Sequence, residues 1–157
     1  MKKASFVLLA FVSFSAFAQI KVSDAWVRST TPAQGATGGF MTIKADQKVK
    51  VVGAESAVAG IVELHQMSMN SAGVMSMREV DALEIAAGEA LELKPGGYHL
   101  MLMDLKKKPL ATGDTLPVVL KFQTADGKLH TQNVSMEVRA ITAPAKPSDH
   151  HNHHHHH

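Results

Sequence analysis

Residues 60–81 read GIVELHQMSMNSAGVMSMREVD, which is two runs of alternating side chains on either side of a turn-forming segment. Side chains two positions apart on a β-strand point to the same face of a sheet. The shared faces of the two runs carry one histidine and four methionines: His65, Met67, Met69, Met75 and Met77. Residues 70–74 suit a five-residue hairpin loop. The stretch therefore predicts a β-hairpin, and with it an all-β fold.

The hairpin loop also predicts which residues lie opposite one another. A loop over 70–74 places Met69 across from Met75 and Met67 across from Met77. Directly opposed residues on one face have Cβ atoms about 5 Å apart. We therefore expect a local cluster of thioethers with His65 at its edge.

The rest of the chain is dominated by short strand-like runs between turn residues. Asp126-Gly127 lies between two such runs and is a hairpin signal. Helical periodicity is weak, with one short helical turn expected around 55–59. Many short strands of this kind indicate a single-domain sandwich or small barrel. The expected strands are 22–28, 38–43, 49–54, 60–69, 75–81, 91–93, 99–105, 118–124 and 128–141.

The two ends of the chain differ from this pattern. Lys2 and Lys3, an apolar run over 6–12 and Ala16-Phe17-Ala18 have the form of a secretory signal peptide. We expect residues 1–18 to be removed and Gln19 to begin a periplasmic protein. The β-domain is then residues 19–142, and residues 143–157 form a flexible Pro/His-rich tail.

Charge and cysteine content exclude several classes of protein. Removal of Lys2 and Lys3 leaves 14 basic and 14 acidic residues, so we expect no nucleic-acid partner. No mature segment reaches transmembrane length. The chain has no cysteine, which excludes disulfides, Fe–S clusters and a thiolate-ligated blue-copper site. No nucleophile–base pair or acidic dyad stands out, so we expect a protein that is not an enzyme. We also expect it to be a monomer.

A third run repeats the histidine–methionine pattern. His99, Met101 and Met103 alternate with Leu100 and Leu102, and six of the nine methionines fall between positions 67 and 103. A single strand methionine is usually core filler. Core filling is a poorer explanation for two strands that both carry His-x-Met. An imidazole on an apolar face costs free energy unless its nitrogens have a partner. Thioethers and imidazoles together favour copper, and thioethers favour Cu(I).

The spacing of these residues resembles the motif of the periplasmic copper chaperone family, PCu(A)C, also written PCuAC. That motif is a His, an optional Met, ten residues, a Met, twenty-one residues and His-x-Met. Here Gln66 takes the optional place, ten residues (67–76) precede Met77, and twenty-one (78–98) precede His99-Leu100-Met101. The resemblance extends over roughly 22–138, including Asp24-Ala25-Trp26-Val27-Arg28 and Lys94-Pro95-Gly96-Gly97-Tyr98.

The resemblance implies a cupredoxin-like, Greek-key β-sandwich with one Cu(I) site and no catalysis. The implied ligands are His65, Met77, His99 and Met101, with Met67, Met69, Met75 and Met103 as auxiliary or packing neighbours. It also implies delivery of copper to a partner, either cytochrome c oxidase subunit II with its Cu(A) centre or another copper chaperone. Because imidazole must be neutral to bind a metal, we expect weaker binding below about pH 6.5.

Two interpretations of the C-terminal histidines are possible: they are a purification tag, or they are a native extension that binds Cu(II). Asn152 interrupts the run, which favours the native reading. The candidate Cu(II) ligands of the tail are His150, His151, His153, His154, His155, His156 and His157.

Four other functions are weighed against the copper carrier. They are copper storage or resistance, electron transfer by a cupredoxin-like protein, haem binding through His and Met, and an adhesion or structural sandwich with a methionine-rich core. Electron-transfer sites of this fold use a Cys thiolate, and covalent haem attachment needs C-x-x-C-H, so the lack of cysteine counts against both.

Overall fold

The computed structural model describes residues 18–106 and 109–140, and every regular element in these ranges is a β-strand. The predicted signal peptide lies outside the described residues except for Ala18, and the predicted tail lies wholly outside them. Among the described residues, we find no helix of the length and apolarity needed to cross a membrane. The strands are β1 (Ile20–Arg28), β2 (Thr37–Ala45), β3 (Val49–Glu55), β4 (Ala59–Met69), β5 (Met75–Glu79), β6 (Leu83–Ile85), β7 (Ala90–Leu93), β8 (Tyr98–Leu105), β9 (Thr115–Thr124) and β10 (Leu129–Arg139).

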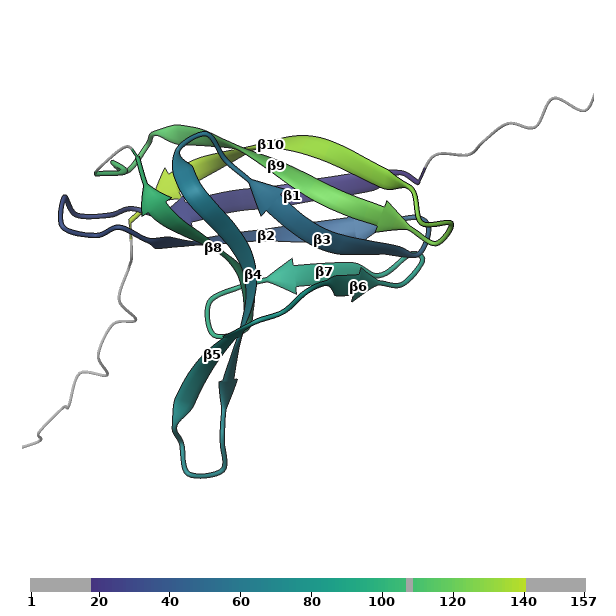
Figure 1. Ribbon diagram of the computed structural model, residues 1–157, viewed down its shortest axis with the longest axis horizontal. Coiled ribbons are helices and arrows are strands. Elements are labelled where there is room, and N and C mark those ends of the chain that lie inside the picture. Colours follow the sequence, from purple (N-terminus) through teal and green to yellow (C-terminus); the bar gives the residue numbers. More distant parts are fainter. Residues whose placement is uncertain (1–17, 107–108, 141–157) are drawn as a thin grey trace, which may run out of the picture.

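The ten strands form one hydrogen-bonded sheet that folds over on itself as a cupredoxin-like β-sandwich (Figure 1). Its order is β5-β4-β8-β2-β1-β10-β9-β3-β6, and β7 also pairs with β2. Strand β2 joins the two halves, because its first residues pair with β8 and its later residues with β7, while β1 lies along its other edge. β1 and β10 run parallel, and the other pairs are antiparallel. The predicted fold class is confirmed.

The two layers enclose a single hydrophobic core. Strand β9 shows the pattern most clearly, since alternate residues from Leu116 to Phe122 are buried and those between them are not. In β8, Leu100 and Leu102 are fully buried in the same core, so His99 and Met101 lie on the other face of that strand. Each such buried side chain contributes about 1.5–3 kcal/mol, which rigidly fixes the strand that carries the two candidate ligands.

Nine of the observed strands correspond to predicted ones, with ends that differ by a few residues. β9 begins earlier than predicted and includes Pro117, which pairs with Ser135 of β10. The pairing of β9 with β3 is observed only as far as Val119, so proline is tolerated where a strand has a neighbour on one side only. Position 141, the predicted end of the last strand, lies outside the described residues.

Two local predictions were wrong. The strand β6 was missed, because three residues are too few to show a period. The helical turn expected at 55–59 is a non-helical turn between β3 and β4. Ser56 explains it, because its hydroxyl donates to the carbonyl of Pro117 at 2.6 Å and its carbonyl accepts from the Ala59 amide at 3.2 Å, which closes the turn at the first residue of β4.

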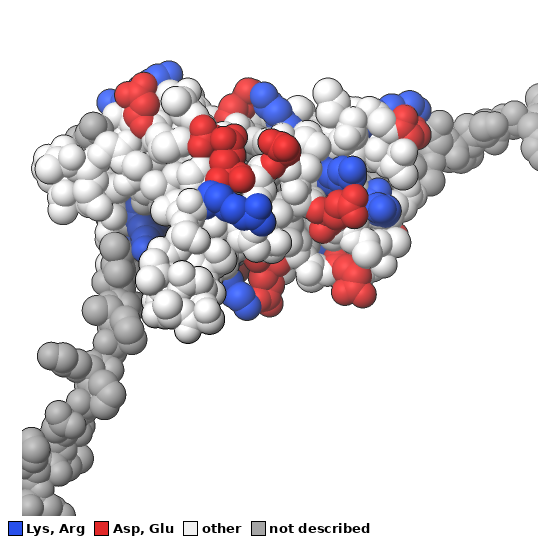
Figure 2. Space-filling model, turned by 60° about the horizontal axis from the view of Figure 1, so that its bottom comes forward, with Lys and Arg blue, Asp and Glu red and all other residues white. Residues whose placement is uncertain are grey.

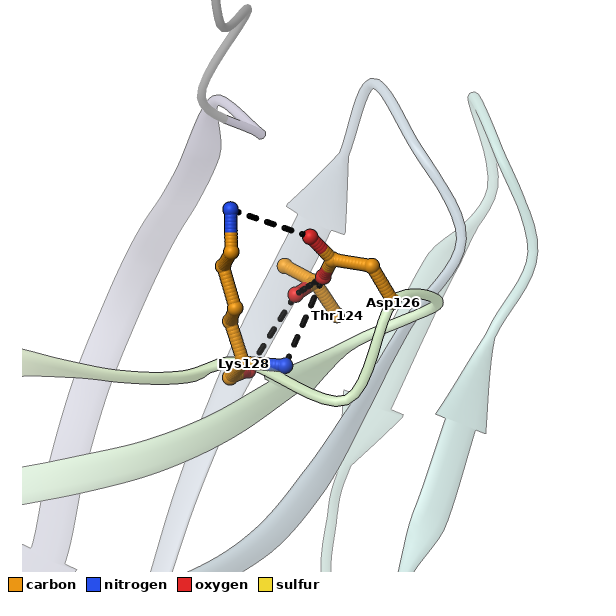
Figure 3. Close-up of polar contacts among 3 residues, drawn as sticks. All are labelled: Thr124, Asp126 and Lys128. Atoms are coloured by element: carbon orange, nitrogen blue, oxygen red, sulfur yellow. Dashed lines mark hydrogen bonds and ion pairs between the residues drawn. The ribbon is translucent and has the colours of Figure 1, made fainter.

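The predicted hairpin at Asp126-Gly127 is confirmed as the β9–β10 connection (Figure 3). The Thr124 hydroxyl donates to the Asp126 carboxylate, and Lys128 forms a 3.3 Å ion pair with the same side chain. The Thr124 hydrogen bond, followed by those of Lys128, lowers the pKa of the Asp126 carboxyl. Gly127 takes a φ of 85°, which residues with a Cβ rarely adopt.

Candidate metal centre

The β4 and β8 strands bring the two predicted histidines face to face. His65 and His99 are direct partners in the antiparallel pair, so their side chains lie on the same face of the sheet. Their ring centroids are 5.7 Å apart at an interplanar angle of 65°. Strand alternation alone does not show that the strand of His99 lies beside the hairpin, and the pairing of β4 with β8 supplies that contact.

The β4–β5 hairpin has the predicted register. Met67 pairs with Met77 and Met69 with Met75, and His65 lies opposite Glu79. The loop is stabilised by Asn70, whose side-chain oxygen accepts from the amides of Ala72 and Val74 at 3.0 and 2.9 Å. The hairpin therefore places Met77 on the same face as His65, one strand away.

Three of the four predicted ligands line one cavity of about 220 Å³. Met77 from β5 and His99 and Met101 from β8 contribute to its wall, together with Met67 of β4. His65 adjoins this cavity as the cross-strand neighbour of His99. The structure thus brings the two imidazoles and two thioethers of the predicted ligand set together from three strands.

The wall of the cavity also includes Phe40 and Arg28. The Phe40 ring lies 6.3 Å from the His99 ring, and the Arg28 guanidinium lies 5.2 Å from the centre of the Phe40 ring. His99 itself is only 5% exposed. Burial lowers the pKa of His99, and the positive fields of His65 and Arg28 lower it further, while the hydrogen bond to Gly97 acts in the opposite direction. The ring is therefore held in the neutral form that a metal needs.

The hydrogen bond of His99 selects one of its two nitrogens for a metal. Nδ1 lies 3.2 Å from the carbonyl oxygen of Gly97. A carbonyl only accepts, so the proton of the neutral ring is on Nδ1, and the lone pair is on Nε2. Hydrogen bonds of this kind fix the tautomer and orientation of metal-binding histidines.

His65 has the opposite arrangement. Its Nε2 lies 2.7 Å from the carboxylate of Glu63, which accepts the ring proton. The remaining nitrogen, Nδ1, is buried and has no hydrogen-bond partner. A buried nitrogen lone pair without a partner costs about 1–3 kcal/mol, so its position beside a histidine–methionine cavity fits a metal ligand. The donor set is soft and uncharged, which suits Cu(I).

Sequence reasoning missed three residues at this centre. Glu63 orients His65 from two positions away on the same strand, a spacing that could have signalled it. Arg28 and Phe40 come from β1 and β2, on the far side of β8 in the sheet order, and no local sequence pattern links them to the site. Only the folded sheet brings these two residues to the cavity.

The predicted auxiliary methionines differ in their distance from the cavity and in their exposure. Met67 lines the cavity with Met77. Met69 and Met75 lie farther along the hairpin and are exposed. Met103 is opposite Ile61, two positions beyond Met101 along β8. The tail histidines lie outside the described residues.

The fold is that of PCuAC domains. The apo PCuAC domain from PmoF1 superimposes with a TM-score of 0.63 at 23% sequence identity, covering 78% of this chain and 94% of that one. The copper-bound PCuAC domain from PmoF2 gives a TM-score of 0.61 at 22% identity, covering 78% and 93%. The resemblance to the PCu(A)C family predicted from the motif is confirmed at the level of fold.

The sequence comparisons name the family. Residues 20–149 match the LpqE-like family, described as "Putative lipoprotein LpqE-like". "Putative lipoprotein Lxx21020" of Leifsonia xyli subsp. xyli is 36% identical over 121 residues, covering 76% of this chain and 69% of the relative. The chain belongs to the LpqE-like family.

Proposed function

We propose that this protein is an exported copper chaperone that binds one Cu(I) through His65, Met77, His99 and Met101. The observation that carries the proposal is the pairing of His65 with His99 beside a cavity lined by Met77 and Met101. The fold it shares with a copper-bound PCuAC domain supports copper as the cargo. The signal-peptide pattern and a relative described as a putative lipoprotein support export to the periplasm.

The nature of the ligands favours transfer rather than storage or catalysis. All four are neutral, so they do not compensate the charge of the ion, and no thiolate is present to hold it tightly. Met77 is 48% exposed, which leaves one side of the centre open to ligands of an acceptor. An incoming sulfur or imidazole can therefore replace Met77 without unfolding the site.

The positive charge of Arg28 at the cavity wall favours the monovalent ion. Repulsion between two charges scales with their product, so a divalent ion is opposed about twice as strongly as a monovalent one. The thioethers have the same preference because they are soft ligands. Both effects support Cu(I) as the cargo of this centre, with Cu(II) reserved for the C-terminal histidines.

The binding site is tested by Cu(I) titration against a competing chelator, without oxygen, in chains whose seven tail histidines are replaced by serine. The parent should bind one Cu(I) tightly, and Met77→Leu and Met101→Leu should each weaken this binding about tenfold or more, because leucine keeps the volume but removes the sulfur. Met103→Leu is the matched control from the same strand and should leave the affinity within about twofold. Equal losses in Met101→Leu and Met103→Leu, or no binding by the parent, would refute the assignment.

The acceptor we propose is the Cu(A)-bearing subunit II of cytochrome c oxidase. The loaded protein is mixed with the copper-free soluble domain of that subunit, and the copper content of each is measured after separation. Copper should move to the acceptor domain. Retention of all copper by the chaperone would exclude this acceptor, and another copper chaperone would take its place as the next candidate.

A further inference from the structure

The β4–β5 hairpin extends beyond the sandwich (Figure 1). Pairing of β4 with β8 reaches Gln66 opposite Tyr98, whereas pairing of β4 with β5 continues to Met69 opposite Met75. Residues 67–77 are therefore a two-stranded projection from the root of the His/Met centre. No charged residue occurs within it, and in Figure 2 it comes toward the viewer as an uncharged knob.

The two faces of this projection differ in chemistry. On one face, the Ser68 and Ser76 hydroxyls lie 3.1 Å apart, and Arg78 donates to the side chain of Gln66 at 2.7 Å. The opposite face carries two stacked cross-strand pairs of thioethers, and we call it the methionine ladder: Met67, Met69, Met75 and Met77. Strand alternation therefore keeps the polar pairs and the thioethers on separate faces.

The ladder is not part of the hydrophobic core. Met69 is 67% exposed and Met75 is 46% exposed, whereas the core methionines Met41 and Met136 are 2% and 0% exposed. Exposed apolar surface costs about 25 cal/mol per Å², and a strand that faces water normally carries polar residues there. Core filling, the usual explanation for methionine, therefore does not account for these two residues.

The geometry of the ladder lets three sulfurs meet around one ion. Met69 and Met75 are directly opposed, and Met67 and Met75 are diagonal neighbours, a separation of about 7–8 Å that long flexible side chains span. Thioethers bind soft monovalent cations such as Cu(I) and Ag(I) and have little affinity for hard divalent ions. Met67 also lines the cavity of the His/Met centre, so the ladder is continuous with that centre.

We propose that Met67, Met69 and Met75 form a second, all-thioether site for a soft monovalent cation. It goes beyond the proposed function, because its ligands are different and its binding does not require a histidine. The site is weaker than the His/Met centre, since it lacks imidazole and is open to water.

The test is a titration of the full chain, labelled with ¹³C at the methionine methyl groups, with Ag(I) as a redox-stable probe. Methyl signals report each methionine separately, and ion held by the histidine tail adds no signal of its own. Met77 and Met101 should shift first, and Met67, Met69 and Met75 should shift in a later step. Met41 and Met136 are internal controls and should not move.

Two variants separate sulfur ligation from apolar exposure. Met69→Leu and Met75→Leu keep the apolar surface and the fold. Each should abolish the later shift of the remaining two methionines among Met67, Met69 and Met75. The affinity that governs the first step should stay within about twofold. A later shift of Met67 that persists in both variants would overturn the proposal. So would signals of Met67, Met69 and Met75 that stay silent in the parent, or that move together with Met77 in a single step.

The same titration distinguishes this proposal from the proposed function. A response of Met67, Met69 and Met75 with Met77 and Met101 silent would support the ladder and refute the His/Met centre. A response of Met77 and Met101 alone would do the reverse. Repeating the titration with Cu(I) under reducing, oxygen-free conditions should give the same order of response.

Discussion

The two histidines of the centre offer different nitrogens, although they are direct neighbours across the sheet. Gly97 holds the proton of His99 on Nδ1, and Glu63 holds that of His65 on Nε2. The lone pairs that remain, Nε2 of His99 and Nδ1 of His65, are those a metal would use. At this scale a backbone carbonyl and one carboxylate determine how each ring can act, and neither residue is itself a ligand.

Acid should destabilise the protein through His99. Burial lowers the pKa of this ring in the folded chain below its ordinary value, so the unfolded state binds the proton more readily. This makes the free energy of unfolding decrease as the pH falls below about 6.5. The change is measured by urea unfolding of the metal-free protein at about pH 7 and about pH 5.5.

His99→Gln is the control for this effect, because glutamine cannot take up the proton. This variant should lose less stability than the parent between the two pH values. The lowered pKa also keeps the His99 ring neutral to a lower pH than an ordinary histidine. The contribution of His99 to the Cu(I) affinity should therefore persist to a lower pH than that of an ordinary histidine. Equal pH dependence of unfolding in the parent and the variant would contradict the assignment.

Among the elements, the β4–β5 hairpin decides whether the centre can form. It supplies Met77, it continues into the methionine ladder, and it is held from only one side of β5. Its register depends on a short loop in which Asn70 caps two amides and Gly73 takes a φ of 78°. A shift of one residue would turn every methionine of β5 to the polar face.

Gly73→Ala should therefore weaken Cu(I) binding without unfolding the sandwich. A non-glycine residue at this positive φ costs about 1–2 kcal/mol. The substitution should destabilise mainly the hairpin, because its outer part pairs with no third strand in the sheet order. Amide exchange in residues 66–78 should become faster, and the affinity for Cu(I) should fall severalfold. Amide hydrogen exchange and the competitive Cu(I) titration measure the two effects.

Gly127→Ala is the matched control for the hairpin variant. Gly127 has a similar φ of 85° but lies in the β9–β10 turn, away from the residues that line the metal cavity. Its replacement should cost a similar amount of stability and leave the Cu(I) affinity unchanged. A loss of affinity as large as that of Gly73→Ala would show that general destabilisation, rather than the hairpin, is responsible.

In the molecule as a whole, the core holds β4 and β8, which carry three of the candidate ligands, whereas β5 has no buried residue and is held only by its pairing with β4. Buried residues of β2, β3, β4, β8, β9 and β10 belong to one cluster. β3 and β4 are not hydrogen-bonded neighbours, yet they contact each other as the sheet closes. The candidate centre lies on the outer face of this closed structure, where Met77 is exposed.

Leu102→Ala tests the contribution of the core. The Leu102 side chain is fully buried, on the face of β8 opposite to His99 and Met101. Its truncation to alanine should lower the free energy of unfolding by about 2–5 kcal/mol. Leu129→Ala, at a position 70% exposed, should change it by about 0.5 kcal/mol or less. Urea unfolding measures both, and similar values for the two variants would contradict the placement of the core.

The local features of this protein follow from its sequence, because strand alternation and turn chemistry act over a few residues. These features are the two faces of β4, β5 and β8, the loop over 70–74 and the register of the thioethers. Short apolar runs such as β6 carry too few residues for a pattern to be recognised. The same limit hid the turn at Ser56, which is closed by a contact with Pro117 far along the chain.

Only the tertiary structure decided which strand faces lie next to one another. The pairing of His65 with His99, the approach of Arg28 and Phe40 to the cavity, and the exposure of the methionine ladder all depend on which strands become neighbours. That choice is made by burial of one shared core, a property of all the strands together. The sequence therefore predicted the faces that carry the candidate ligands, while folding of the whole sheet determined where those faces converge and which side stays open to water.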